Sequence, residues 1–180
     1  MSINFEPLYI WQADEHTIKS VDFAETNVQE ALQQAGKVEN LLAFAKEIQA
    51  YADERPKEDY VRECFGSMVS IASKCNSHAL CFETEFPIED EYLYVLVKAA
   101  KHAGLTVYDP NNGCVFFPSG RVLPPNVNNW WNAIVAEQEK EAQLLAANPT
   151  LPKNREQFEE WASPVYKEVS LLGGGYVLYR

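Results

Sequence analysis

Residues 79–118, ALCFETEFPIEDEYLYVLVKAAKHAGLTVYDPNNGCVFFP, decide the fold of this chain. At the start of the stretch two sets of side chains alternate, and this period of two predicts a half-buried strand. One face would carry Leu80, Phe82, Thr84 and Phe86, and the other Cys81, Glu83 and Glu85. Pro87 ends the strand, because proline cannot donate to a sheet ladder.

A helix follows, and its ends carry the residue types that helix ends favour. Glu89, Asp90 and Glu91 place negative charge in the first turn, where the helix dipole stabilises it. Gly104 follows the last turn, where glycine adopts a left-handed backbone without strain. The apolar positions recur at helical spacing, at Leu93, Leu96, Val97 and Ala100.

Two short strands complete the stretch. Residues 105–108 and 114–117 are mostly apolar, and Asp109-Pro-Asn-Asn-Gly113 between them has the composition of a tight turn. The second strand should therefore return antiparallel to the first. We predict a β-α-β-β unit over residues 79–118.

The chain before this unit predicts one strand and several helices. Residues 7–11 are aromatic and β-branched, and Pro7 favours an edge position for that strand. Asn27 and Glu30 have the spacing of a capping box at a helix start. The apolar pattern that follows continues past Gly36 as one long helix to Pro56, and a third helical pattern covers 61–72.

The chain after the unit predicts further helices at 128–147 and 155–161. The tail allows either a helix followed by a strand or a hairpin turned at the glycines 173–175, and we expect a terminal strand at 176–179. Taken together, the pattern predicts a single α+β domain over residues 1–180. Its sheet would be antiparallel or mixed, with about four or five strands and the helices packed on one side.

Length and charge restrict the class of partner. A chain of 180 residues that is 47% hydrophobic is long enough to bury a sizeable core. Lys and Arg number 15 against 26 Asp and Glu, so the net charge is −11. That charge repels nucleic acid and anionic membranes and favours a cationic partner, although solubility alone also explains it.

The cysteines and the N-terminus predict a cytoplasmic protein. Cys64, Cys75, Cys81 and Cys114 lie in apolar patterns without Cys-x-x-Cys spacing, so we expect small core side chains in a reduced compartment. The N-terminus lacks the basic and apolar segments of a signal peptide. No apolar run approaches the roughly 18 residues that predict a membrane span.

No motif in the chain predicts a cofactor, a metal site or a catalytic residue. His16, His78 and His102 are far apart and lack metal-ligand spacing. Ser119 is not in a Gly-x-Ser-x-Gly pattern, and the glycines 173–175 lack the Lys and Ser or Thr of a phosphate-binding loop.

One polar cluster could still form a site that is assembled only in the fold. The residues of this polar mouth are His102, Asp109, Asn111 and Asn112. Asp and Asn beside a proline usually bond their own backbone, so turn chemistry is the simpler explanation of the last three.

An acidic block predicts a partner-binding surface. Between Lys74 and Lys98 there are five carboxylates and no Lys or Arg. We name this set the acidic ledge: Glu83, Glu85, Glu89, Asp90 and Glu91. Such a surface would attract a cationic protein, with Tyr92 and Tyr94 as aromatic anchors beside it. A solvated face with no partner is the alternative explanation.

The segment 97–118 resembles part of a group of small bacterial proteins. The shared pattern is an apolar helix, Gly104-Leu105, a short strand, Tyr108-Asp-Pro110 and a polar turn, and Leu8-Tyr-Ile-Trp11 resembles their first strand. Some of these proteins are immunity proteins of polymorphic toxin systems. The chain departs from the pattern at Asn111, where glutamine is expected, and the resemblance implies no catalytic residue.

We therefore expect a non-enzymatic cytoplasmic immunity or inhibitor protein that binds a protein toxin through the acidic ledge. A small enzyme with its site near Asp109 and His102 is one alternative. A structural adaptor of a phage or secretion assembly, with Trp130 and Trp131 as contacts, is another.

Overall fold

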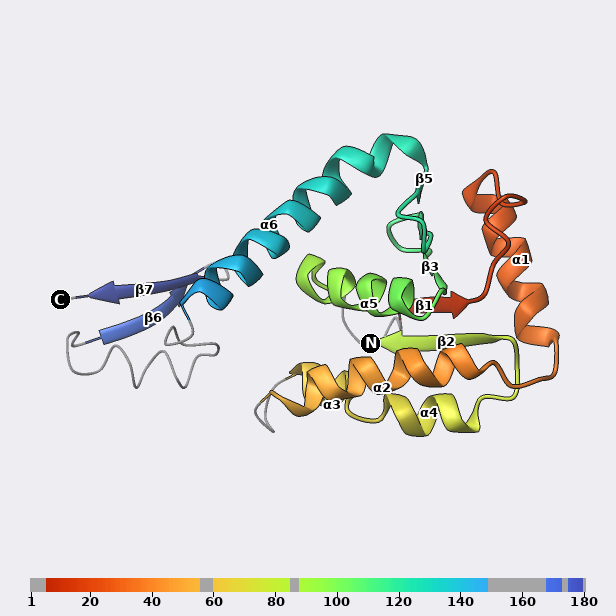
Figure 1. The fold of residues 1–180 in the computed structure, drawn as a ribbon, viewed down its shortest axis with the longest axis horizontal. Coiled ribbons are helices and arrows are strands. Elements are labelled where there is room, and N and C mark those ends of the chain that lie inside the picture. Colours follow the sequence, from red (N-terminus) through yellow and green to blue (C-terminus); the bar gives the residue numbers. More distant parts are fainter. Residues whose placement is uncertain (1–5, 56–59, 85–87, 149–167, 173–174, 180) are drawn as a thin grey trace, which may run out of the picture. The chain divides into compact units, whose positions relative to one another are not determined.

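The computed structural model describes residues 6–55, 60–84, 88–148, 168–172 and 175–179 (Figure 1). Its internal contacts divide the chain into two compact units, Met1–Ala136 and Glu137–Arg180. We describe each unit by itself. The expectation of a single domain stays a prediction.

The first unit is built on an open five-stranded antiparallel sheet with the strand order β2-β1-β3-β4-β5. The strands are β1 (Glu6–Trp11), β2 (Ala79–Thr84), β3 (Thr106–Asp109), β4 (Cys114–Phe116) and β5 (Val122–Leu123). This sheet confirms the predicted α+β class. The predicted β-α-β-β unit is also confirmed, as β2, α5, β3 and β4.

The strand β1 lies inside the sheet, so its predicted edge position is wrong. It pairs antiparallel with β2 along its whole length and with β3 over residues 9–11. Pro7 lies opposite Glu83 of β2, at the end of β1 that β3 does not reach. Proline is tolerated there because no second ladder needs its missing N–H. Since β2 and β3 are both antiparallel to β1, they are parallel to each other, and β1 separates them within a split β-α-β unit.

Six α-helices lie among the described residues. They are α1 (Val21–Gln33), α2 (Glu39–Asp53), α3 (Tyr60–Phe65), α4 (Met68–Lys74), α5 (Asp90–His102) and α6 (Asn128–Ala147), and a short 3₁₀ turn η1 (Pro125–Val127) precedes α6. The helix predicted at 128–147 is confirmed. None of the described helices is both long and apolar enough to cross a membrane.

The first helix begins earlier than the capping box predicted. Ser20 is its N-cap, and the Ser20 hydroxyl accepts a hydrogen bond from the Phe23 amide. Asn27 lies inside the helix instead, where its Oδ1 accepts from the Trp11 indole N–H at 2.9 Å. The Asn27 side chain therefore satisfies a buried aromatic donor of the sheet, and not a helix end.

The long predicted helix is interrupted at Gly36. The Gly36 N–H donates to the Asn76 carbonyl, and Ala35 forms an isolated bridge with Ser77. A Cβ at position 36 would lie 2.4 Å from Nε2 of the exposed His78 side chain, so a larger residue there requires that side chain to move. The chain enters α2 after this contact.

The C-terminal end of α5 agrees with its sequence pattern. Gly104 has φ of 69°. Its N–H donates to the Lys101 carbonyl, and the Leu105 N–H donates to the Ala100 carbonyl at 2.8 Å. These two bonds form a Schellman motif, which ends the helix and directs the chain into β3.

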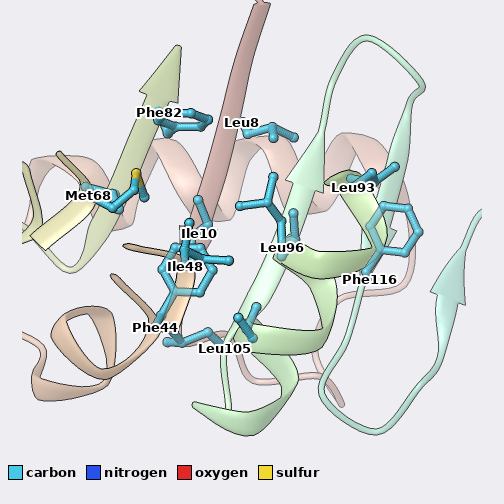
Figure 2. Close-up of a cluster of buried hydrophobic side chains, with 14 of the residues drawn as sticks. Leu8, Ile10, Phe44, Ile48, Met68, Phe82, Leu93, Leu96, Leu105 and Phe116 are labelled. Carbon is cyan, nitrogen blue, oxygen red and sulfur yellow. The ribbon is translucent and has the colours of Figure 1, made fainter. Parts of the chain in front are cut away.

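The larger hydrophobic core covers one face of the sheet. Figure 2 shows Leu8 and Ile10 of β1 and Phe82 of β2 pointing toward side chains from α2, α4 and α5, among them Phe44 and Leu96. The start of α6 closes the far end of this core, where the Trp131 ring packs 4.5 Å from the Phe116 ring between centroids. Each buried side chain of this size contributes roughly 1.5–3 kcal/mol.

The opposite face of the sheet carries a second core, beneath α1. Trp11, Tyr108 and Val115 point to this face, where Ala24 and Val28 of α1 cover them. We expected all helices on one side, and α1 departs from that arrangement. The cause is visible in β1, where residues on both faces are large and apolar.

The second unit contains the end of α6 and a hairpin. Strand β6 (Glu168–Leu172) pairs antiparallel with β7 (Gly175–Tyr179), so the expected terminal strand is confirmed and the hairpin alternative describes the tail. The helix predicted at 155–161 lies outside the described residues.

Candidate functional site

The acidic ledge is divided between the end of β2 and the start of α5. Glu83 is exposed on β2, and Glu89 and Asp90 are exposed at the N-terminal end of α5. Glu89 is the N-cap residue of α5, but its side chain makes no capping hydrogen bond. Glu85 lies outside the described residues. Among the described basic side chains, none forms a salt bridge with Glu83, Glu89 or Asp90.

Glu91 has a different environment from the other described acids of the ledge. Its Oε1 accepts from the Tyr51 hydroxyl at 3.2 Å and lies 3.4 Å from Nη2 of Arg55. The Arg55 guanidinium also donates to the Tyr51 hydroxyl and lies over the Tyr51 ring. Glu91 thus joins the start of α5 to the end of α2. The Glu91 carboxylate therefore has partners within the fold already, unlike the other described acids of the ledge.

The Tyr51 hydroxyl in this network stays protonated. Burial raises its pKa well above the ordinary value of 10.0, and the negative charge of Glu91 raises it further, against the opposite effect of Arg55. A protonated hydroxyl can donate to the Glu91 carboxylate, which is the role that it has here.

The two predicted aromatic anchors are half-buried. Tyr92 and Tyr94 both pack against the larger core. The Tyr94 ring lies 6.4 Å from the Trp131 ring between centroids, and Nζ of Lys98 lies 5.6 Å from the centre of the Tyr94 ring. Each tyrosine therefore has a packed side and an exposed side, a property of residues that anchor interfaces.

The polar mouth is dominated by one internal hydrogen-bonded turn. Asp109 is only 4% exposed, and its Oδ1 accepts from the N–H groups of Asn111 and Asn112 at 3.0 and 3.2 Å. Its Oδ2 accepts from the Asn112 side-chain amide at 2.7 Å. The carboxylate is therefore used by the turn that joins β3 to β4.

His102, the fourth residue of the polar mouth, has a partner elsewhere. Its Nδ1 lies 2.8 Å from Oε1 of Glu47 on α2, at an exposed position. Among the described residues, no hydrogen bond or ion pair joins His102 to Asp109 or Asn112, and each is bonded to other residues instead.

Cys114 follows this turn and is buried. Its thiol donates to the Asn112 carbonyl at 3.1 Å. Burial raises its pKa from 9.0 to about 11, and the negative charge of Asp109 adds to the effect. The thiol is therefore neutral at physiological pH, which makes it a weak nucleophile.

A groove beside β2 was not predicted from the sequence. It has a volume of about 420 Å³. The residues that line it are Leu32 of α1, Ile71 and Lys74 of α4, and Cys75, Ser77, Ala79, Leu80 and Cys81 from the segment that leads into β2. The sequence contains no local signal for it, because the walls come from positions about forty residues apart that meet only in the fold.

The four cysteines divide between the core and this groove. Cys114 is buried as predicted, and Cys64 packs half-buried against the larger core. Cys75 packs half-buried against the larger core and also lines the groove, whereas Cys81 is half-buried in the groove wall. None of these four described cysteines forms a disulfide.

A second hollow, of about 340 Å³, lies at the start of α2. Gln12, Lys37, Asn40 and His78 are among its lining residues, and all four are polar or charged. Among the described residues, no group of three or more His, Cys, Asp or Glu side chains is arranged to hold a metal ion.

Comparisons with protein-family models, curated proteins and solved structures find no match to this chain. The resemblance to immunity proteins therefore remains a prediction from the residues that carry it.

Proposed function

We propose that this chain is a non-enzymatic immunity or inhibitor protein of the bacterial cytoplasm, which binds a basic protein toxin through the acidic ledge. Three exposed carboxylates, Glu83, Glu89 and Asp90, carry the proposal, since no described basic side chain neutralises them. They belong to a chain with a net charge of −11. None of them would have to give up a described salt bridge to meet a cationic partner.

The ledge is held in place by the fold around it. Glu83 is fixed by the pairing of β2 with β1, and the start of α5 is tied to α2 through Glu91 and Arg55. Charges on ordered elements lose less freedom on binding than charges on loose loops. The half-buried Tyr92 and Tyr94 add apolar surface beside the charges.

The physics of exposed charges predicts how such binding would behave. Surface carboxylates mainly raise the association rate, by attracting a cationic partner before contact. Salt screens this attraction, with a Debye length of about 8 Å at physiological ionic strength. The association rate with the partner should therefore fall steeply as salt is added, whereas the dissociation rate should change less.

The two alternatives receive less support from the described contacts. The enzyme alternative needs a free polar group, but the Asp109 carboxylate is bonded within its turn. The adaptor alternative needs exposed tryptophans, but Trp131 is 6% exposed and packs on Phe116 and Trp130.

Co-expression with the product of the neighbouring gene tests the proposal. We expect that product to stop growth of a bacterial host and this chain to restore it. The variant Glu83→Lys/Glu89→Lys/Asp90→Lys should lose protection while keeping its unfolding midpoint. The matched control Glu137→Lys/Glu139→Lys/Glu141→Lys changes the net charge equally, at exposed positions of α6, and should still protect. A product that is harmless, or equally toxic with and without this chain, would contradict the proposal.

A further inference from the structure

The strand β2 is an outer strand of the five-stranded sheet. It pairs with β1 on one side, and no strand in the described part of the chain pairs with its other side. At the start of this outer edge the Ala79 carbonyl already accepts from the Ser77 hydroxyl at 2.7 Å, so the backbone groups that a further strand could bond are those from Leu80 to Glu83. Proteins usually cover or block an edge of this kind.

The groove of about 420 Å³ lies beside the first half of β2, where Ala79, Leu80 and Cys81 line it. Leu32 comes from α1, which packs on one face of the sheet, and Ile71 comes from α4, which belongs to the core on the other face. The groove is shallow and open to solvent, so it suits an extended chain that lies on the surface and not an enclosed ligand.

We propose that this groove binds an extended segment of the basic partner, which adds a strand to the sheet beside β2. The segment's main chain would bond the outer edge of β2 at the usual strand spacing of about 4.8 Å. Alternate side chains would enter the groove against Leu32 and Ile71. The inference rests on the proposed function for the partner's charge and extends it by naming the way in which the partner binds.

The net charge of −11 favours a basic segment over a second copy of this chain, because two equally acidic copies would repel each other.

The charges along the edge define what the segment carries. Lys74 lines the groove near the start of β2, whereas Glu83 is exposed near its end. The segment should therefore have a basic side chain at the Glu83 end and none at the Lys74 end. Burial and the neighbouring Glu83 raise the pKa of the Cys81 thiol, so that Cys81 contributes a neutral wall between the two charges.

Random-sequence peptides displayed on phage, selected on the full chain, test the proposal. We expect selected peptides to be rich in β-branched and basic residues and poor in proline. Their affinity should fall on the order of three- to ten-fold for Glu83→Lys at low salt. Glu63→Lys makes the same charge change at an exposed position on α3 and should leave the affinity unchanged. Leu32→Arg should abolish binding by filling the groove.

Amide hydrogen exchange of the wild-type chain provides a readout that does not depend on a variant's folding. A selected peptide should slow exchange in β2 residues 80–83. Recovery of no peptide, binding equal in wild type and Glu83→Lys, or protection away from β2 would overturn the proposal. A concentration-dependent dimer that protects the same residues without peptide would overturn it in favour of a second copy.

The two proposals can fail separately. Relief of toxicity without protection of β2 would leave the immunity function in place and remove the docking mode. Peptides that bind at β2, with no toxin neutralised, would leave the docking surface and remove the immunity function.

Discussion

The β-α-β-β unit carries acidic residues in two places, around the end of β2 and in the turn after β3, and the two groups have opposite environments. At the turn between β3 and β4, the Asp109 carboxylate is buried and accepts three hydrogen bonds from Asn111 and Asn112. At the ledge, Glu83, Glu89 and Asp90 face solvent without a described cationic partner. The difference teaches that a carboxylate is available to a partner only where the local backbone has not already used it.

Glu91 lies between these two extremes. It belongs to the ledge by sequence, but Tyr51 and Arg55 engage it from α2. A contact with a residue forty positions earlier in the chain decides its role. Three kinds of acid therefore occur within one supersecondary unit, and substitutions at each should give effects of different size.

Replacing the turn carboxylate should have the largest effect on stability. Asp109→Ala removes the acceptor of three hydrogen bonds and should lower the free energy of unfolding by about 1–3 kcal/mol in urea titrations. Asp109→Asn keeps one acceptor oxygen and should lose less. Equal stability of Asp109→Ala and wild type would mean that the turn does not depend on this side chain.

The Cys114 thiol should make stability fall at alkaline pH. Its pKa is raised from 9.0 to about 11 in the folded chain, so the unfolded state releases this proton first. The stabilising contribution is complete below about pH 9 and is lost as the pH rises toward 11. Urea midpoints measured across this range should fall less for Cys114→Ala than for wild type. Parallel pH profiles of the two proteins would contradict the prediction, because tyrosines common to both would then explain the whole fall.

The Glu91–Arg55 pair should have a smaller effect. Its side chains are 44% and 25% exposed, so solvent screens the interaction and a coupling energy of about 0.2–1 kcal/mol is expected. A double-mutant cycle of Glu91→Gln and Arg55→Met in urea isolates that energy from the other contacts of Arg55. A coupling energy of zero would mean that the Glu91–Arg55 pair does not stabilise the fold and that Glu91 behaves like the solvent-exposed acids.

Neutralising an exposed acid of the ledge should have the smallest effect on stability. Glu83→Gln should change the free energy of unfolding by less than about 0.5 kcal/mol, because this exposed side chain has no described salt-bridge partner. The same substitution should slow association with a basic partner. A loss of stability as large as that of Asp109→Ala would contradict the comparison between the acidic ledge and the turn.

Sequence reasoning succeeded for features that depend on neighbours in the chain. The alternation in β2, the glycine after α5 and the turn at 109–113 each combine residues a few positions apart, and all three are present in the structure. The residues of the ledge could be named for the same reason. The bonds of Glu91 with Tyr51 and of His102 with Glu47 could not be predicted, because Tyr51 and Glu47 are on the distant helix α2.

Errors occurred where two local patterns competed. Ser20 and Asn27 are both good N-cap residues. In the structure Ser20 is the N-cap, and the Asn27 side chain accepts a hydrogen bond from the Trp11 indole N–H. Gly36 is tolerated within a helical pattern, but α1 ends at Gln33 and the backbone at 35 and 36 bonds residues 76 and 77 instead. Pro7 favours an edge strand, but β3 ends before reaching it.

The sequence by itself therefore determined the identity of most elements, the α+β class and the excess of negative charge, since propensity, periodicity and composition act over short distances along the chain. Only the tertiary structure decided that β1 lies between β2 and β3, that α1 covers the second face, and that a groove lies beside the first half of β2. Those outcomes depend on burying large apolar side chains from distant segments together, which no short stretch of residues records.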